Sequence, residues 1–185
     1  MNMDKTYIDE LLKYGEHINL ECKRAEKGVP KSIWETYSAF ANTSGGTIIL
    51  GVDEDLQADN WDDRFSVLGV HNPENIVKDF WNTINSDKVN ACILKDENVQ
   101  IVEYGEQVSI VVIQVPQAAY NMKPVFINDN VYKGTFKRNF EGDYHCEEGA
   151  VNAMIRDAND DGNDGNIGVF LKNISDETLT INEGE

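Results

Sequence analysis

Acidic side chains occur in this sequence at spacings that could bind a metal ion. Ile18, Leu20 and Cys22 alternate with polar residues, a pattern typical of a β-strand over Ile18–Cys22. Glu21 and Lys23 lie two residues apart and therefore share the opposite face of that strand. Glu16 is out of phase with them, so it can converge on Glu21 only from the turn that precedes the strand.

A second acidic group follows an apolar run over Thr47–Val52, which predicts a buried strand. Asp53 and Glu54 stand at its end. If the two predicted strands are neighbours, Glu16, Glu21 and one of these two acids would surround one point. Clustered carboxylates suit Mg²⁺ or Mn²⁺, ions that can drive phosphodiester hydrolysis. The alternative is that all of them are solvated acids at strand ends.

Basic residues form two clusters that could follow a nucleic-acid backbone. The first consists of Lys23, Arg24, Lys27 and Lys31. The second consists of Lys133, Lys137 and Arg138, with Tyr132, Phe136 and Phe140 interleaved. Basic side chains combined with aromatic rings can pair with phosphates and stack on bases. The alternative for both clusters is ordinary surface charge.

The segment Asn42-Thr43-Ser44-Gly45-Gly46 offers backbone N–H groups that could hold an anion, with Asn42 and Thr43 as further donors. The chain contains no GxxxxGK[ST] motif, so ATP binding of the Walker type is not expected. No GxSxG motif is present either, which removes the basis for a serine hydrolase. The three histidines have no metal-ligand spacing.

Composition bounds the class of protein. The 185 residues carry a net charge of −17, which disfavours strong, general nucleic-acid binding and predicts weak, local contact. No apolar run approaches the roughly 18–20 residues of a membrane span, so neither a membrane partner nor a location outside the cytoplasm is expected. The three cysteines are widely separated and are predicted to be reduced and structural.

Periodicity predicts an α+β domain with about four helices and a mixed sheet of about five or six strands. The helices are expected over Thr6–Tyr14, Pro30–Asn42, Pro73–Ile84 and Glu147–Ala158. Besides the two strands above, short strand candidates are Val67–Val70, Asn90–Leu94, Gln100–Tyr104, Val108–Val115, Val125–Ile127 and Val131–Tyr132. Residues 1–158 would form this domain. Residues 159–185 would form an acidic linker and tail with a possible strand pair, Ile167–Leu171 and Thr178–Ile181.

Three segments together resemble the Schlafen/AlbA-like DNA-binding domain family. They are Glu16-x-x-x-x-Glu21-x-Lys23, then Ala39-Phe40-Ala41-Asn42-Thr43-x-Gly45-Gly46, then Ile49-x-Gly51-Val52-Asp53. The segments Pro124–Phe126 and Val131–Phe140 resemble the end of the domain, so the resemblance covers roughly Thr6–Ala158. Bacteria often carry this domain in proteins named as transcriptional regulators or as helicase-related.

The resemblance implies an AlbA-like fold, contact with DNA or RNA through basic surface residues, and a homodimer. Animal Schlafen domains are RNA endonucleases with three acids. Two of these match Glu16 and Glu21, and the third matches Glu54, where aspartate is usual and Asp53 could substitute. The expected function is therefore a nucleic-acid-binding module. A metal-dependent endoribonuclease and a protein-interaction or dimerisation module remain the alternatives.

Overall fold

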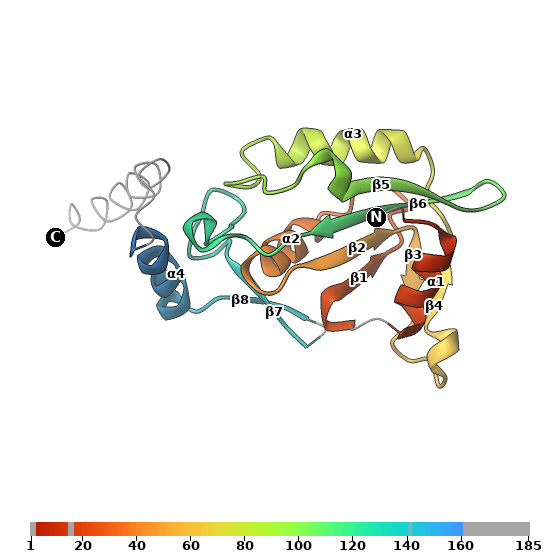
Figure 1. Ribbon diagram of the computed structural model, residues 1–185, viewed down its shortest axis with the longest axis horizontal. Helices are drawn as coiled ribbons and strands as arrows, with labels where there is room; N and C mark the ends of the chain where they lie inside the picture. Colours follow the sequence, from red (N-terminus) through yellow and green to blue (C-terminus); the bar gives the residue numbers. More distant parts are fainter. Residues whose placement is uncertain (1–2, 15–16, 141, 161–185) are drawn as a thin grey trace.

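The computed structural model describes residues 3–14, 17–140 and 142–160. Its centre is a four-stranded sheet with the order β1-β2-β6-β5, in which β1 and β2 are parallel and the other pairs are antiparallel (Figure 1). The strands are β1 (Leu20–Lys23), β2 (Gly46–Leu50), β5 (Val99–Gly105) and β6 (Val108–Val115). The helices are α1 (Lys5–Tyr14), α2 (Ile33–Asn42), α3 (Pro73–Ile84) and α4 (Glu148–Asp160).

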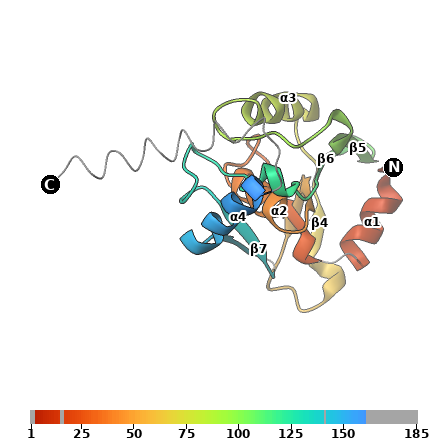
Figure 2. The same ribbon diagram turned by 60° about the vertical axis from the view of Figure 1, so that its left-hand side comes forward.

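Alternation along the strands divides the apolar residues between the two faces of this sheet. On one face Ile49 of β2 packs with Ile8 of α1. On the other face Ile48 packs with Phe40 of α2 and Phe80 of α3. The sheet is therefore covered by α1 on one side and by α2 and α3 on the other, and Figure 2 shows α1 well separated from those two helices.

Two hairpins complete the described fold. The pair β3 (Val52–Glu54) and β4 (Phe65–Val67) extends from the end of β2, with a short 3₁₀ helix over Trp61–Asp63 between its strands. The pair β7 (Phe136–Asn139) and β8 (Gly142–His145) lies against α2. Helix α4 follows β8 and lies at the end of the molecule away from α1 (Figure 1).

The close packing of α2 on β2 explains the two consecutive glycines between them. Gly45 has φ +74°, a backbone conformation that side chains disfavour, and a Cβ there would lie 2.7 Å from the Val115 carbonyl oxygen. A Cβ on Gly46 would lie 2.7 Å from the ring of Phe40. The N–H groups of Thr43 and Gly45 bond to carbonyls of the last turn of α2, so the helix end uses donors that were expected to hold an anion.

The predicted α+β class is confirmed, as are the four helices and the mixed sheet. The predictions for α3 and β6 match the observed bounds, and those for α1, β2 and β5 differ by a residue or two. Both elements with matching bounds carry long, regular apolar patterns. Helix α2 begins three residues later than expected, and the predicted strand Val67–Val70 is found as β4, two residues earlier.

Four strand predictions are wrong in detail. Residues His17–Asn19 form a 3₁₀ helix rather than the start of a strand, so Ile18 is 39% exposed. Asn90–Leu94 is not a strand, because Asn90 pairs with Phe126 through its side chain and backbone. Val125–Ile127 makes only isolated bridges, and Val131–Tyr132 lies in a turn.

At the carboxyl end, α4 continues to Asp160, so the first two residues of the predicted linker are helical. The rest of the tail, including the predicted strand pair Ile167–Leu171 and Thr178–Ile181, lies outside the described residues. Within the residues that are described, no helix is long and apolar enough to span a membrane.

Candidate nucleic-acid interface

Arg138 of β7 is a buried structural residue, not a surface contact for nucleic acid. Its side chain is only 2% exposed. Nε donates to the Ile18 carbonyl at 2.8 Å and Nη2 donates to the Leu20 carbonyl at 3.0 Å. Nη1 donates to Glu21 at 3.0 Å and to Asp143 of β8 at 2.8 Å. The guanidinium therefore joins the β7–β8 hairpin to the start of β1, and the prediction that it binds nucleic acid is wrong.

Glu21 is shared between two cations. Its Oε2 accepts from Arg138, and its Oε1 accepts from Lys23 Nζ at 2.9 Å. The side chains of Lys23 and Glu21 are 14% and 21% exposed. Both residues do lie on the same face of β1, as their spacing predicts. That face is covered by β7, however, so Lys23 is committed to Glu21 rather than presented to solvent.

Asn42 and Thr43 are also structural. Asn42 is buried, and its side chain donates to the Val125 carbonyl at 2.8 Å and to the Phe136 carbonyl at 3.0 Å while accepting from the Val125 N–H. Thr43 Oγ1 accepts from the backbone N–H of Arg138 at 2.9 Å. Both side chains hold α2 to the segments around β7. The expectation that they contact a ligand is therefore wrong.

Asp53 and Glu54 each have a separate arginine partner. Arg24 binds Asp53 with two hydrogen bonds, of 2.6 and 2.5 Å, and this pairing holds the pKa of Asp53 below its usual value. Arg64 binds Glu54 at 2.6 Å. Arg24 is thus occupied, although its side chain is 54% exposed. The two neighbouring acids point to different partners instead of to one centre.

The predicted metal centre does not assemble from the acids that can be placed. In the described part of the chain, no three His, Cys, Asp or Glu side chains are grouped closely enough to hold a metal ion. Glu21, Asp53 and Glu54 already bind lysine or arginine, so their oxygens do not form an open donor set. Glu16 lies outside the described residues. The roles predicted for Glu16, Glu21, Lys23, Asp53 and Glu54 in catalysis stay predictions.

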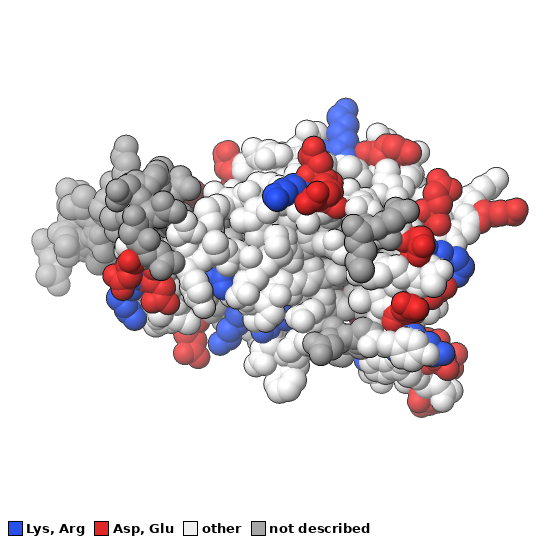
Figure 3. All heavy atoms as spheres, viewed as in Figure 1, with Lys and Arg blue, Asp and Glu red and all other residues white. Residues whose placement is uncertain are grey.

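The remaining predicted basic residues divide between two places. Lys27 and Lys31 are exposed in the segment that leads from β1 to α2. Lys133 is exposed in the turn before β7, and Lys137 is half-buried on β7 itself. Figure 3 shows Lys and Arg atoms over β7 and β8. These lysines are the predicted contacts that the fold leaves available.

The outer face of the β7–β8 hairpin combines a lysine with aromatic rings. Lys137 is the direct cross-strand partner of Tyr144, so both project from the face opposite Arg138 and Asp143. Tyr144 is 53% exposed, and Phe140 in the turn is 76% exposed. We call Lys137, Phe140 and Tyr144 the hairpin face. Sequence reasoning missed Tyr144 and strand β8; the alternation over 142–145 after a Phe-rich turn is the signal that could have located them.

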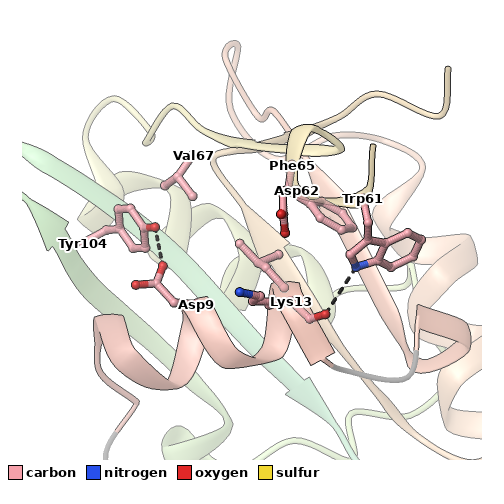
Figure 4. Close-up of a pocket in the computed structure, with 8 residues that line it drawn as sticks. Asp9, Lys13, Trp61, Asp62, Phe65, Val67 and Tyr104 are labelled. Carbon is pink, nitrogen blue, oxygen red and sulfur yellow. Dashed lines mark hydrogen bonds between the residues drawn. The ribbon is translucent and has the colours of Figure 1, made fainter. Parts of the chain in front are cut away.

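A pocket of about 340 Å³ lies elsewhere, between α1 and the β3–β4 hairpin (Figure 4). Trp61 Nε1 closes one end by donating to the Lys13 carbonyl at 3.3 Å. At the other end the Tyr104 hydroxyl donates to Asp9. None of the residues predicted from the sequence to act in binding or catalysis lines this pocket.

Comparison with known proteins agrees with this architecture. The structure resembles the solution structure of the N-terminal domain of an ATP-dependent DNA helicase RecG-related protein from Nitrosomonas europaea, with a TM-score of 0.57 and 27% sequence identity. The match covers 79% of this chain and 94% of that one. No curated protein matches the chain. The Schlafen, AlbA_2 family model matches residues 16–147, and the chain therefore belongs to this family.

Proposed function

We propose that this domain binds single-stranded nucleic acid, weakly, through the hairpin face. The observation that carries the proposal is the cross-strand pair of Lys137 and Tyr144 beside the exposed ring of Phe140. A lysine can neutralise a phosphate, and exposed aromatic rings stack on unpaired bases without regard to sequence. Bases within a duplex are already stacked on one another, so the two rings favour a single strand.

The interior of the hairpin supports this use of its outer face. Arg138 and Asp143 bond to each other on the inner face and to β1 and α2, which fixes the hairpin against the body of the domain. A fixed hairpin presents its outer side chains with little loss of freedom on binding. The family and the RecG-related neighbour are consistent with a nucleic-acid-related role.

The net charge of −17 sets an upper limit on affinity. Long-range repulsion opposes the approach of a polyanion, and only local contacts offset it. We therefore expect dissociation constants in the range of non-specific binding, about 10⁻⁴–10⁻⁶ M at physiological salt.

Fluorescence anisotropy with labelled single-stranded DNA, RNA and duplex DNA tests the proposal. The parent chain is expected to bind both single strands more tightly than the duplex. A Phe140→Ser/Tyr144→Ser variant should lose about 1–3 kcal/mol for each stacked base. Leu56→Ser, which removes a side chain that is 70% exposed on the far hairpin, is the matched control and should bind like the parent. Equal binding by the aromatic variant and the parent would contradict the proposal.

A further inference from the structure

One end of the central sheet carries a row of uncharged polar side chains on the face that α1 covers elsewhere. Thr47 of β2 and Gln114 of β6 are direct cross-strand partners there. Asn19, just before β1, and Ser44, just before β2, border the same hollow of about 290 Å³. We call Asn19, Ser44, Thr47 and Gln114 the amide pocket.

The pocket exists because the sheet is longer than the helix that covers it. Two residues along β2 from Thr47, Ile49 is buried under α1, and two residues along β6 from Gln114, Val112 is buried with it. Each strand thus changes from apolar to polar on the same face at the same level. Leu11 of α1 borders the hollow and marks the limit of the apolar cover.

The hydrogen-bonding groups of the amide pocket are not used by the rest of the fold. Among the described residues, none of its four side chains forms a hydrogen bond or ion pair with another described residue. The described lining also contains no charged side chain, in a chain of which 26% of residues are charged. By contrast, Asn42 nearby satisfies its amide fully with backbone groups. The pocket therefore presents free neutral donors and acceptors together.

The amide pocket adjoins the segments that hold the β7–β8 hairpin. Arg138 of β7 donates from its side chain to the carbonyl of Ile18, the neighbour of Asn19. Its backbone N–H donates to Thr43, the neighbour of Ser44. The inner side of β7 is therefore bonded to both borders of the pocket, which places the pocket next to the proposed path of a nucleic-acid strand.

We propose that the amide pocket receives one nucleobase and reads its hydrogen-bonding edge. This inference rests on the proposed function. Asparagine and glutamine amides carry a donor and an acceptor side by side, the arrangement that pairs with the edge of a base, and hydroxyl groups can serve either part. A neutral lining suits an uncharged base and offers nothing to a phosphate. The hairpin face would supply affinity, and the pocket would supply base preference.

The test compares the affinities of the folded chain for twelve-nucleotide DNA strands made only of adenine, cytosine or thymine. The parent is expected to prefer one base. Gln114→Leu and Asn19→Ala should each reduce that preference, by about tenfold where the contact is bidentate. The dependence of affinity on salt should not change. Gln57→Leu, which alters an exposed glutamine in the β3–β4 loop, is the matched control and should keep the preference.

The outcomes separate this inference from the proposed function. Equal affinity of the parent for the three strands, or a preference that survives both pocket variants, would overturn the base-reading site alone. Failure of the parent to bind any strand would overturn the proposed function and the site together. As a second readout, the side-chain amide NMR signals of Asn19 and Gln114 should shift when the preferred strand is added, and unchanged signals would count against the site.

Discussion

Arg138 and Glu21 are 117 residues apart in the sequence, and their side chains meet at 3.0 Å inside the fold. This pair closes the β7–β8 hairpin onto the first strand of the central sheet. It also decides the direction in which the hairpin presents its other residues. Because Arg138 points inward, Lys137 and Tyr144 point outward, and the proposed interface depends on that arrangement.

Removing the buried guanidinium should destabilise the domain strongly. Arg138→Ala would leave Asp143 and two backbone carbonyls without their donor, and breaking one side of a buried ion pair costs about 3–5 kcal/mol. Urea denaturation measures the loss. Lys137→Ala, one residue away on the outer face, should change the free energy of unfolding by no more than about 0.5 kcal/mol. Similar stabilities for the two variants would show that Arg138 is not the link described.

The two glycines after α2 should not tolerate a side chain. Gly46→Ala would place a methyl group against the ring of Phe40, and overpacking of this kind costs about 1–3 kcal/mol. A Cβ on Gly149, in the first turn of α4, would meet nothing within 4 Å, so Gly149→Ala should be neutral or stabilising. Thermal denaturation of both variants checks the contrast, and an unaffected Gly46→Ala variant would contradict the packing.

Burial of Cys22 should make its thiol unreactive in the folded protein. Burial raises the pKa of Cys22 above its ordinary value of 9.0, and thiol reagents attack only the thiolate. We expect the half-buried Cys92 to be labelled first at pH 8, and Cys22 only after denaturation. The stabilisation linked to the raised pKa is complete below about pH 9.0 and is lost as the pH rises toward the pKa of the folded thiol. Rapid labelling of native Cys22 would contradict its placement.

Local patterns in the sequence were sufficient for α3 and β6, because each carries an uninterrupted apolar periodicity. The sequence was not sufficient for Arg138 or Asn42. Both side chains are buried because their partners come from remote segments, and neither residue type is usually buried on its own. The same reason explains why strand β7 was read as a basic cluster. An inward arginine hides the alternation that would otherwise reveal the strand.

Cleavage is a separate question from binding. We expect the parent chain to bind single-stranded RNA and DNA without cutting them, because Glu21, Asp53 and Glu54 are each engaged by a lysine or arginine. Incubation with Mn²⁺ or Mg²⁺, followed by gel analysis of the products, measures this. Cleavage by the parent that is lost in a folded Glu21→Gln variant would instead establish the metal-dependent endoribonuclease.

The salt dependence of binding tests the hairpin interface most directly. A Lys133→Gln/Lys137→Gln variant should bind single strands more weakly, and the slope of log affinity against log salt should become shallower by about 1.4, the value for two lost phosphate contacts. Lys78→Gln/Lys95→Gln, with two exposed lysines on α3 and before β5, carries the same change in net charge and should keep the slope of the parent. The account predicts a shallower slope only for the hairpin variant. Equal slopes for the two variants would contradict it.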